Sequence, residues 1–287
     1  MSPRAFRRVL AATDLSEGAQ RALERAAVIA RDHGAALAVL HVVDPEVDDL
    51  ALGRGRELVD GLVASLDLAP ETLVRSGRPF EEIVRSAREL DVDLVVLGAS
   101  GGDTVREHVL GTTSERVVRH GDRPVLVVRK PATGVEYARV LAGVDLSEPS
   151  AAALEFARAA FARAELQVVH VRIVVGEHRL RMNGADDEAI AQLRARAMDS
   201  ASVEVDRWLS EQSLPTEAVR VEPGHPPAVL AHLADAGRHE GLVVVGAHGS
   251  TGPRRLLLGS VSQRILRDAR CDVLVVRHGT SRPDPPA

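Results

Sequence analysis

The chain has 287 residues, of which 45% are apolar and 2% aromatic, so it can form two domains with cores of Val, Leu, Ile and Ala. Its formal net charge of −5 argues against nucleic acid as the main partner. The single cysteine, Cys271, excludes an intrachain disulfide and a cysteine-based zinc cluster, and no apolar stretch approaches the length of a membrane span.

Strands and helices are predicted to alternate through the first half of the chain. Short apolar runs at 9–12, 36–43, 71–75, 93–97 and 124–128 predict five strands. Helices are expected near 15–32, 50–66, 80–90 and 112–120, with Ser16 as an N-cap, Gly34 as a terminator and Pro79 in a first turn. This alternation is typical of βαβ units and a parallel sheet.

The same pattern restarts after a short linker at 131–134. Residues 139–147 match 8–16, and Val-Leu-Val-Val-Arg occurs at both 125–129 and 273–277. The second copy adds a polar loop at 176–188 and a long helix at 189–211. An internal duplication follows, with domains at 1–132 and 133–287, the second ending in a Pro-rich tail that we expect to be disordered.

Each half is predicted to be a doubly wound α/β domain, Rossmann-like, with five parallel strands in the order 3-2-1-4-5. Strands one and four are then neighbours, and a crevice opens at their carboxyl ends. Asp14 and Gly98 flank it in the first half, and Asp145 and Gly246 flank it in the second. In each half a glycine-rich loop leads from the fourth strand to a helix N-terminus, which is an arrangement that favours phosphate.

These features resemble the universal stress protein family over nearly the whole chain, as two tandem copies. The spacing Gly-x2-Gly-x9-Gly occurs at 98–111 and at 246–259, and Asp-Leu-Ser follows the first strand of each half. The family's nucleotide-binding branch binds ATP, usually with a divalent cation on the phosphates. The resemblance therefore implies ATP and Mg²⁺, with the ion near Asp14 and Asp145.

The resemblance also implies which residues contact the nucleotide. In domain 1 they are Ala12, Thr13, Asp14, Val42, Gly98, Ala99, Ser100, Gly101, Gly102, Gly111, Thr112, Thr113 and Ser114. In domain 2 they are Gly143, Val144, Asp145, Val171, Gly246, Ala247, His248, Gly249, Ser250, Gly259, Ser260, Val261 and Ser262. The valines at 42 and 171 would meet adenine, the aspartates the ribose or cation, and the glycines and hydroxyl residues the phosphates.

The two loops differ in charge, which predicts unequal sites. His248, Arg254 and Arg255 supply positive charge and hydrogen-bond donors in the second loop. Asp103 and Glu107 lie in the first loop, together with Arg106 and His108, and the two acids would oppose a triphosphate unless a cation intervenes. We therefore expect tighter ATP binding in the second half.

Several of these residues have simpler interpretations. Asp14 and Asp145 are also suited to capping the next helix, although a glycine loop across the crevice favours ligand contact. Because no second ligand lies at zinc-like spacing, we expect sheet hydrogen bonds for His41 and His170. His225, His232 and His239 recur every seven residues on one predicted helix that lacks a motif such as H-E-x-x-H, so we expect a solvated or packing stripe. Packing roles are expected for Cys271 and Trp208.

The sequence thus predicts a cytoplasmic, ATP-binding stress or regulatory protein that is not a fast catalyst. It has no P-loop, no kinase signature, no G-x-G-x-x-G after either first strand, and no evident nucleophile with its own base. A slow ATPase or autophosphorylating protein, an adenylating relative and an interaction module without nucleotide remain alternatives. Thr13 and Asp14 stand where adenylating relatives usually carry a glycine-serine loop, which argues against that class.

Partners beyond adenine nucleotide are less defined. The last strands, 125–128 and 273–276, would be apolar sheet edges that need covering. We expect the two halves to pair there about a pseudo-two-fold axis, as dimers of the family do, so that the chain is its own dimer. Association of two chains and the identity of a protein partner stay open, and no membrane partner is expected.

Overall fold

The computed structural model describes residues 6–43, 46, 49–100, 110–132, 134, 136–212, 219–236, 241–247 and 258–277. Its first half consists of β1 (Arg8–Thr13), α1 (Glu17–His33), β2 (Ala36–Val43), α2 (Asp49–Val63), β3 (Glu71–Ser76), α3 (Pro79–Glu89), β4 (Leu94–Gly98), α4 (Thr112–His120) and β5 (Val125–Val128). Its second half consists of β6 (Arg139–Val144), α5 (Glu148–Ala160), β7 (Glu165–Arg172), α6 (Glu177–Met182), α7 (Asp187–Glu211), β8 (Arg220–Pro223), α8 (Pro226–Ala236), β9 (Gly241–Gly246), α9 (Ser260–Asp268) and β10 (Asp272–Val276).

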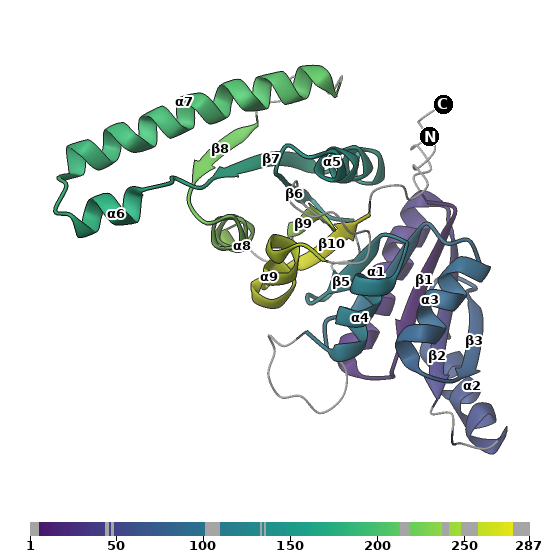
Figure 1. Cartoon of the computed structure of the whole chain (residues 1–287). Coiled ribbons are helices and arrows are strands. Elements are labelled where there is room, and N and C mark those ends of the chain that lie inside the picture. Colours follow the sequence, from purple (N-terminus) through teal and green to yellow (C-terminus); the bar gives the residue numbers. More distant parts are fainter. Residues whose placement is uncertain are drawn as a thin grey trace.

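The strands form one ten-stranded sheet in the order β3-β2-β1-β4-β5-β10-β9-β6-β7-β8 (Figure 1). Each half therefore has the predicted order 3-2-1-4-5. Pairing is parallel within the halves, whereas β5 and β10 pair antiparallel, with Leu126 opposite Leu274. The apolar edges predicted at the last strands thus cover each other, and the halves are related by a pseudo-two-fold arrangement.

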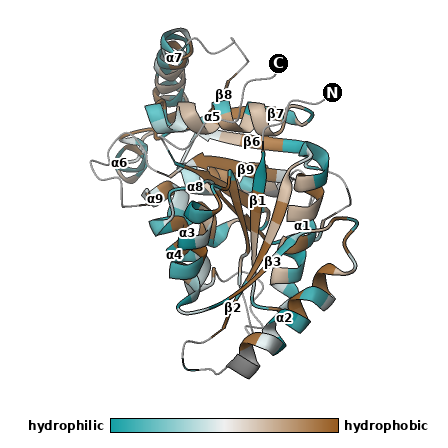
Figure 2. Cartoon of the chain, turned by 90° about the vertical axis from the view of Figure 1, so that its right-hand side faces the viewer, coloured by the Kyte–Doolittle hydropathy of each residue, from teal (hydrophilic) through white to brown (hydrophobic). Residues whose placement is uncertain are grey.

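Alternation along the buried strands separates two layers of the core. In β1, Val9 and Ala11 belong to a core cluster that extends to α1, α2 and α5, while Leu10 and Ala12 belong to a second cluster that extends to α3, α4, α8 and α9. The brown strands between more polar helices in Figure 2 reflect this burial. Sheets covered on both faces require nearly continuous apolar strands, which explains runs such as Leu242–Val245.

Local signals place the helix ends that border the crevices. The Ser16 side chain accepts a hydrogen bond from the Ala19 amide at the start of α1, and Gly34 ends that helix in the left-handed conformation, as predicted. Pro79 lies in the first turn of α3. The expectation of a loop at 176–188 was wrong, because α6 occupies 177–182 and α7 already begins at Asp187, capped by Asp186.

The packing roles predicted for two residues are confirmed. Trp208 of α7 is buried with Val205 and Leu209 against the second half of the sheet. Cys271 is buried beside β10. Figure 1 shows α7 on the outside of the second half, extending beyond the strands that it covers. Among the described helices, none is long and apolar enough to cross a membrane.

Candidate functional site

A cavity of about 540 Å³ opens at the carboxyl ends of β1 and β4, where the strand order of the first half reverses. Crevices at such switch points are where open α/β sheets bind ligands. Its lining contains most of the described residues that the sequence predicts for domain 1, together with others from α1, α3, β2, β4 and the segment before α4: Ala12, Thr13, Asp14, Ala19, Leu40, Val42, Pro79, Ile83, Leu97, Gly98, Ser100, Leu110, Gly111, Thr112, Thr113 and Ser114.

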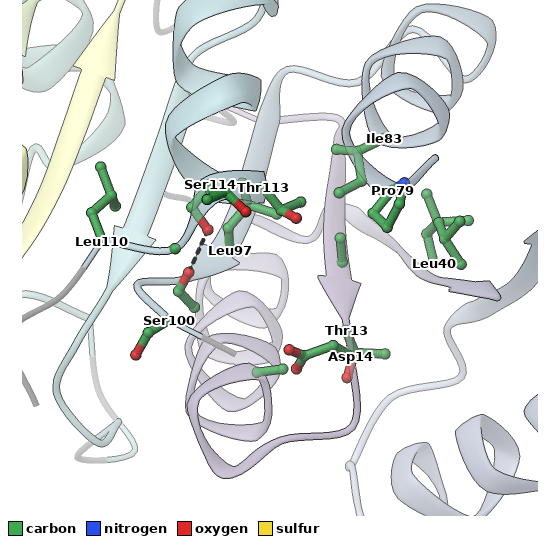
Figure 3. A pocket seen from close by; sticks show the side chains of 16 residues that line it. Thr13, Asp14, Leu40, Pro79, Ile83, Leu97, Ser100, Leu110, Thr113 and Ser114 are labelled. Carbon is green, nitrogen blue, oxygen red and sulfur yellow. Dashed lines mark hydrogen bonds between the residues drawn. The ribbon is translucent and has the colours of Figure 1, made fainter. Parts of the chain in front are cut away.

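The turn after β1 presents Asp14 at the cavity. Asp14 Oδ1 accepts hydrogen bonds from the Ser16 amide (3.1 Å) and the Ser16 hydroxyl, and Thr13 Oγ1 accepts from the Leu15 amide (3.0 Å). Leu15 has φ of +66°, a left-handed conformation that is costly for leucine. The two interpretations of Asp14 are therefore compatible: it orders the turn before α1 and also lines the cavity (Figure 3).

Glycine at the end of β4 permits a close approach to α1. A Cβ atom on Gly98 would lie 2.8 Å from the backbone carbon and oxygen of Gly18, and one on Gly18 would lie 2.5 Å from the Ser100 carbonyl oxygen. Both positions therefore require glycine for packing. The Gly98 requirement has a structural cause that is independent of any phosphate contact.

The start of α4 forms the opposite wall of the cavity (Figure 3). Its N-cap is Gly111, which has no side chain with which to cap the helix and whose amide donates to Ala99 O. The first amides of a helix lack intrahelical acceptors, so those of α4 can serve an anion. Ser114, which was predicted to contact phosphate, lines the cavity and also has a structural role, because its buried hydroxyl donates to Gly98 O at 2.8 Å.

An apolar wall faces these polar groups. Leu40 and Val42 of β2 and Pro79 and Ile83 of α3 supply it. Only Val42 was predicted; Pro79 was identified from the sequence solely as a helix-start residue. His41, next to Val42, hydrogen-bonds through Nδ1 to Thr13 O at 2.9 Å, which confirms the expected sheet contact.

The second half repeats this geometry at the ends of β6 and β9. Asp145 Oδ1 accepts from the Ser147 amide at 3.2 Å, Leu146 has φ of +63°, and Ser262 donates to Gly246 O at 2.7 Å. His170 Nδ1 is 3.0 Å from Val144 O. The cavity, however, is only about 140 Å³, and its lining is Gly143, Val144, Asp145, Ser150, Val171, Pro226, Val245, Gly246, Gly259, Ser260, Val261 and Ser262.

Part of each predicted phosphate loop lies outside the described residues. These positions are Gly101 and Gly102 in the first half and His248, Gly249 and Ser250 in the second. The charged residues behind the predicted ranking of the sites (Asp103, Glu107, Arg254 and Arg255) are also outside. That ranking stays a prediction, and the cavity volumes favour the opposite order.

Metal-binding clusters of three or more His, Cys, Asp or Glu residues do not occur among the described residues. The proposed histidine stripe is not formed as predicted, since His225 precedes α8, which begins at Pro226. His239 lies outside the described residues. Any Mg²⁺ near Asp14 would therefore need ligand oxygens in addition to that carboxylate.

Comparison with known proteins gives consistent matches. The model of the universal stress protein family matches residues 5–129 and 136–277. A universal stress protein from Mycobacterium tuberculosis is 32% identical over 78% of this chain and 77% of its own. The crystal structure of a universal stress protein from Archaeoglobus fulgidus aligns with 98% of both chains, at 21% identity and a TM-score of 0.64. A universal stress protein in complex with cAMP aligns with 43% of this chain at 29% identity, with a TM-score of 0.36.

Proposed function

The chain belongs to the universal stress protein family, and we propose that it is a regulatory member that binds an adenine nucleotide in its first crevice. The observation that carries this proposal is the division of the 540 Å³ cavity into an apolar wall and a wall formed by the hydroxyl residues and first amides of α4. Its volume falls within the roughly 300–1,000 Å³ typical of small-molecule sites. A ligand with a flat apolar base and a phosphate tail matches both walls.

Each part of a nucleotide has a complementary surface. The base fits between Val42 and Ile83, where side chains from β2 and α3 form the apolar wall. Asp14, at the end of β1, is placed to accept hydrogen bonds from ribose hydroxyls or to meet a phosphate-bound cation. The phosphates fit at Thr112 and Thr113, where the amides and the positive end of the α4 dipole favour negative charge.

A regulatory rather than rapidly catalytic role agrees with the chemistry of the described lining. The hydroxyls of Thr112, Thr113 and Ser114 lie in the cavity wall, but none of the described lining residues is a histidine, and Asp14 is the only carboxylate. Nucleophilic catalysis requires a base that activates the nucleophile. Binding would instead act through α4, whose C-terminal carbonyls Val118 O and Arg119 O accept hydrogen bonds from Arg277 of the second half.

The experiment is titration of the full chain with ATP and Mg²⁺ by isothermal calorimetry, alongside identification of nucleotide that co-purifies. Thr112→Glu is the sharpest variant, because Thr112 is exposed at the first position of α4. A carboxylate there suits the helix dipole but repels phosphates, so the fold should persist while affinity falls at least about tenfold.

Thr112→Gln is the matched control, since it has similar size without the charge, and should retain most of the affinity. Substituting Gly98 is a poorer test because any Cβ collides with Gly18. Absence of binding in the wild-type chain would overturn the proposal. Release of ADP during the titration, lost in Asp14→Asn, would instead favour the slow ATPase.

A further inference from the structure

The two crevices share their polar framework but differ in the packing of their apolar walls. The turn after the first strand, the serine bond to the glycine carbonyl and the glycine N-cap are the same in both halves. The cavity is nevertheless about 540 Å³ in one and 140 Å³ in the other. The smaller value lies below the roughly 300 Å³ at which small-molecule sites usually begin.

Two exchanged positions lie at the apolar wall, where the two crevices differ. Two residues before the aspartate that follows the first strand, the chain has Ala12 in the first half and Gly143 in the second. On the helix that faces this strand end, Ile83 of α3 corresponds to Leu230 of α8, because each lies four residues after the proline that begins its helix. Ile83 and Ala12 both line the open cavity of the first half, and Figure 3 shows Ile83 there.

In the second half Leu230 occupies the space that an alanine methyl group would need. A Cβ atom on Gly143 would lie 2.8 Å from Leu230 Cδ1 and 3.3 Å from Cδ2. Leu230 is only 3% exposed and belongs to the same core cluster as Val171 and Val245, which line the smaller cavity. The leucine therefore packs directly on β6 at the base-binding end of the crevice.

Burial of the neighbouring strand agrees with this closure. His170 and Val171 at the end of β7 are 7% and 8% exposed, whereas their counterparts His41 and Val42 on β2 are half-buried. The surface that would meet a base is thus accessible in the first half and covered in the second. The anion-binding end, with Ser260 at the start of α9, remains in the lining.

We infer that Leu230, packed on Gly143, closes the base subsite of the second half, so that each chain binds one adenine nucleotide, in the first half. This inference rests on the proposed function and reverses the order expected from loop charge. Leu230 is accordingly a specificity-determining residue. The crevice that it leaves keeps the end at the start of α9, where an anion could bind, but is too small for a nucleoside.

The test counts bound ATP per full-length chain by native mass spectrometry and equilibrium dialysis. At an ATP concentration that just saturates the wild-type chain, the wild type should bind one, and Thr112→Glu should bind clearly less than one because its affinity is at least about tenfold lower. Leu230→Ala should bind two, and adding Ser260→Glu to Leu230→Ala should return the count to one. Leu209→Ala, which truncates a buried leucine of α7 that lines neither cavity, is the matched control and should leave the count at one.

A reciprocal variant keeps the inference testable if Leu230→Ala does not fold. Ala12→Gly combined with Ile83→Leu transplants the closing pair into the first half with little change in volume, and should weaken ATP binding at least about tenfold. The inference would be overturned if the wild-type chain bound ATP at two equivalent sites. It would also be overturned if folded Leu230→Ala still bound one ATP and the reciprocal variant kept the wild-type affinity. A wild-type chain that binds no ATP would refute the proposed function instead.

Discussion

Neighbouring hydroxyl groups at the start of α4 have different roles. Ser114 donates to Gly98 O from a buried position, whereas Thr112 is exposed at the cavity. Ser114→Ala would leave the Gly98 carbonyl without this donor. We expect the free energy of unfolding to fall by about 1–3 kcal/mol, measured by urea denaturation without nucleotide.

Thr112→Ala is the matched control for this residue-scale prediction. An exposed hydroxyl contributes little to folding, so the free energy of unfolding should change by less than about 0.5 kcal/mol. Its effect should be seen in ATP affinity instead. Equal losses of unfolding free energy in the two variants would show that the hydrogen bond from Ser114 to Gly98 O does not contribute specifically to stability.

At the scale of elements, strand order and crevice position could be predicted because they follow from alternation and the duplicated glycine spacing. The six-residue helix α6 was missed because Glu177–Met182 buries no residue and shows no apolar periodicity. Leu230 was not identified as a site residue, since its position depends on the missing methyl group of Gly143. Such packing between distant segments leaves no local pattern in the sequence.

The helices α4 and α9 are each held at their C-terminal ends by an arginine from the opposite half. Arg277, after β10, donates to Val118 O at 2.7 Å and to Arg119 O, while Arg129, after β5, donates to Leu266 O. Burial lowers the pKa of both guanidinium groups from the ordinary value. The arginine after the last strand of each half thus holds a helix of the other half. The N-terminus of that helix borders the crevice of the half to which the helix belongs.

Removal of one such arginine should loosen a single helix. Arg277→Ala is expected to destabilise the chain by roughly 1.5–3 kcal/mol, because carbonyls at the end of α4 lose a charged donor. Hydrogen exchange should quicken in 112–120 more than in 260–268. Arg270→Ala, at an exposed position, serves as the control. Equal exchange in both helices would contradict the reciprocal arrangement.

For the whole molecule, a buried polar cluster joins the halves beside the central β5–β10 pair. Asp272, 1% exposed, accepts from the backbone amides of Arg129 (2.7 Å) and Lys130 (3.0 Å) and from the Tyr137 hydroxyl (2.6 Å). Its carboxylate also lies 3.7 Å from Arg25 Nε of α1. Burial, with Asp272 nearby, raises the pKa of Tyr137 well above its ordinary value, so the phenol remains a donor.

Asp272→Asn should therefore weaken the coupling between the halves as well as total stability. Removing the carboxylate beside buried Arg25 is expected to cost about 3 kcal/mol. Trp208, the single tryptophan, reports on the second half alone, whereas far-UV circular dichroism reports on both. In urea the two signals should change together in the wild-type chain and separately in Asp272→Asn. Asp268→Asn, an exposed partner of Arg264, should keep them coincident; separate wild-type transitions would contradict a single cooperative unit.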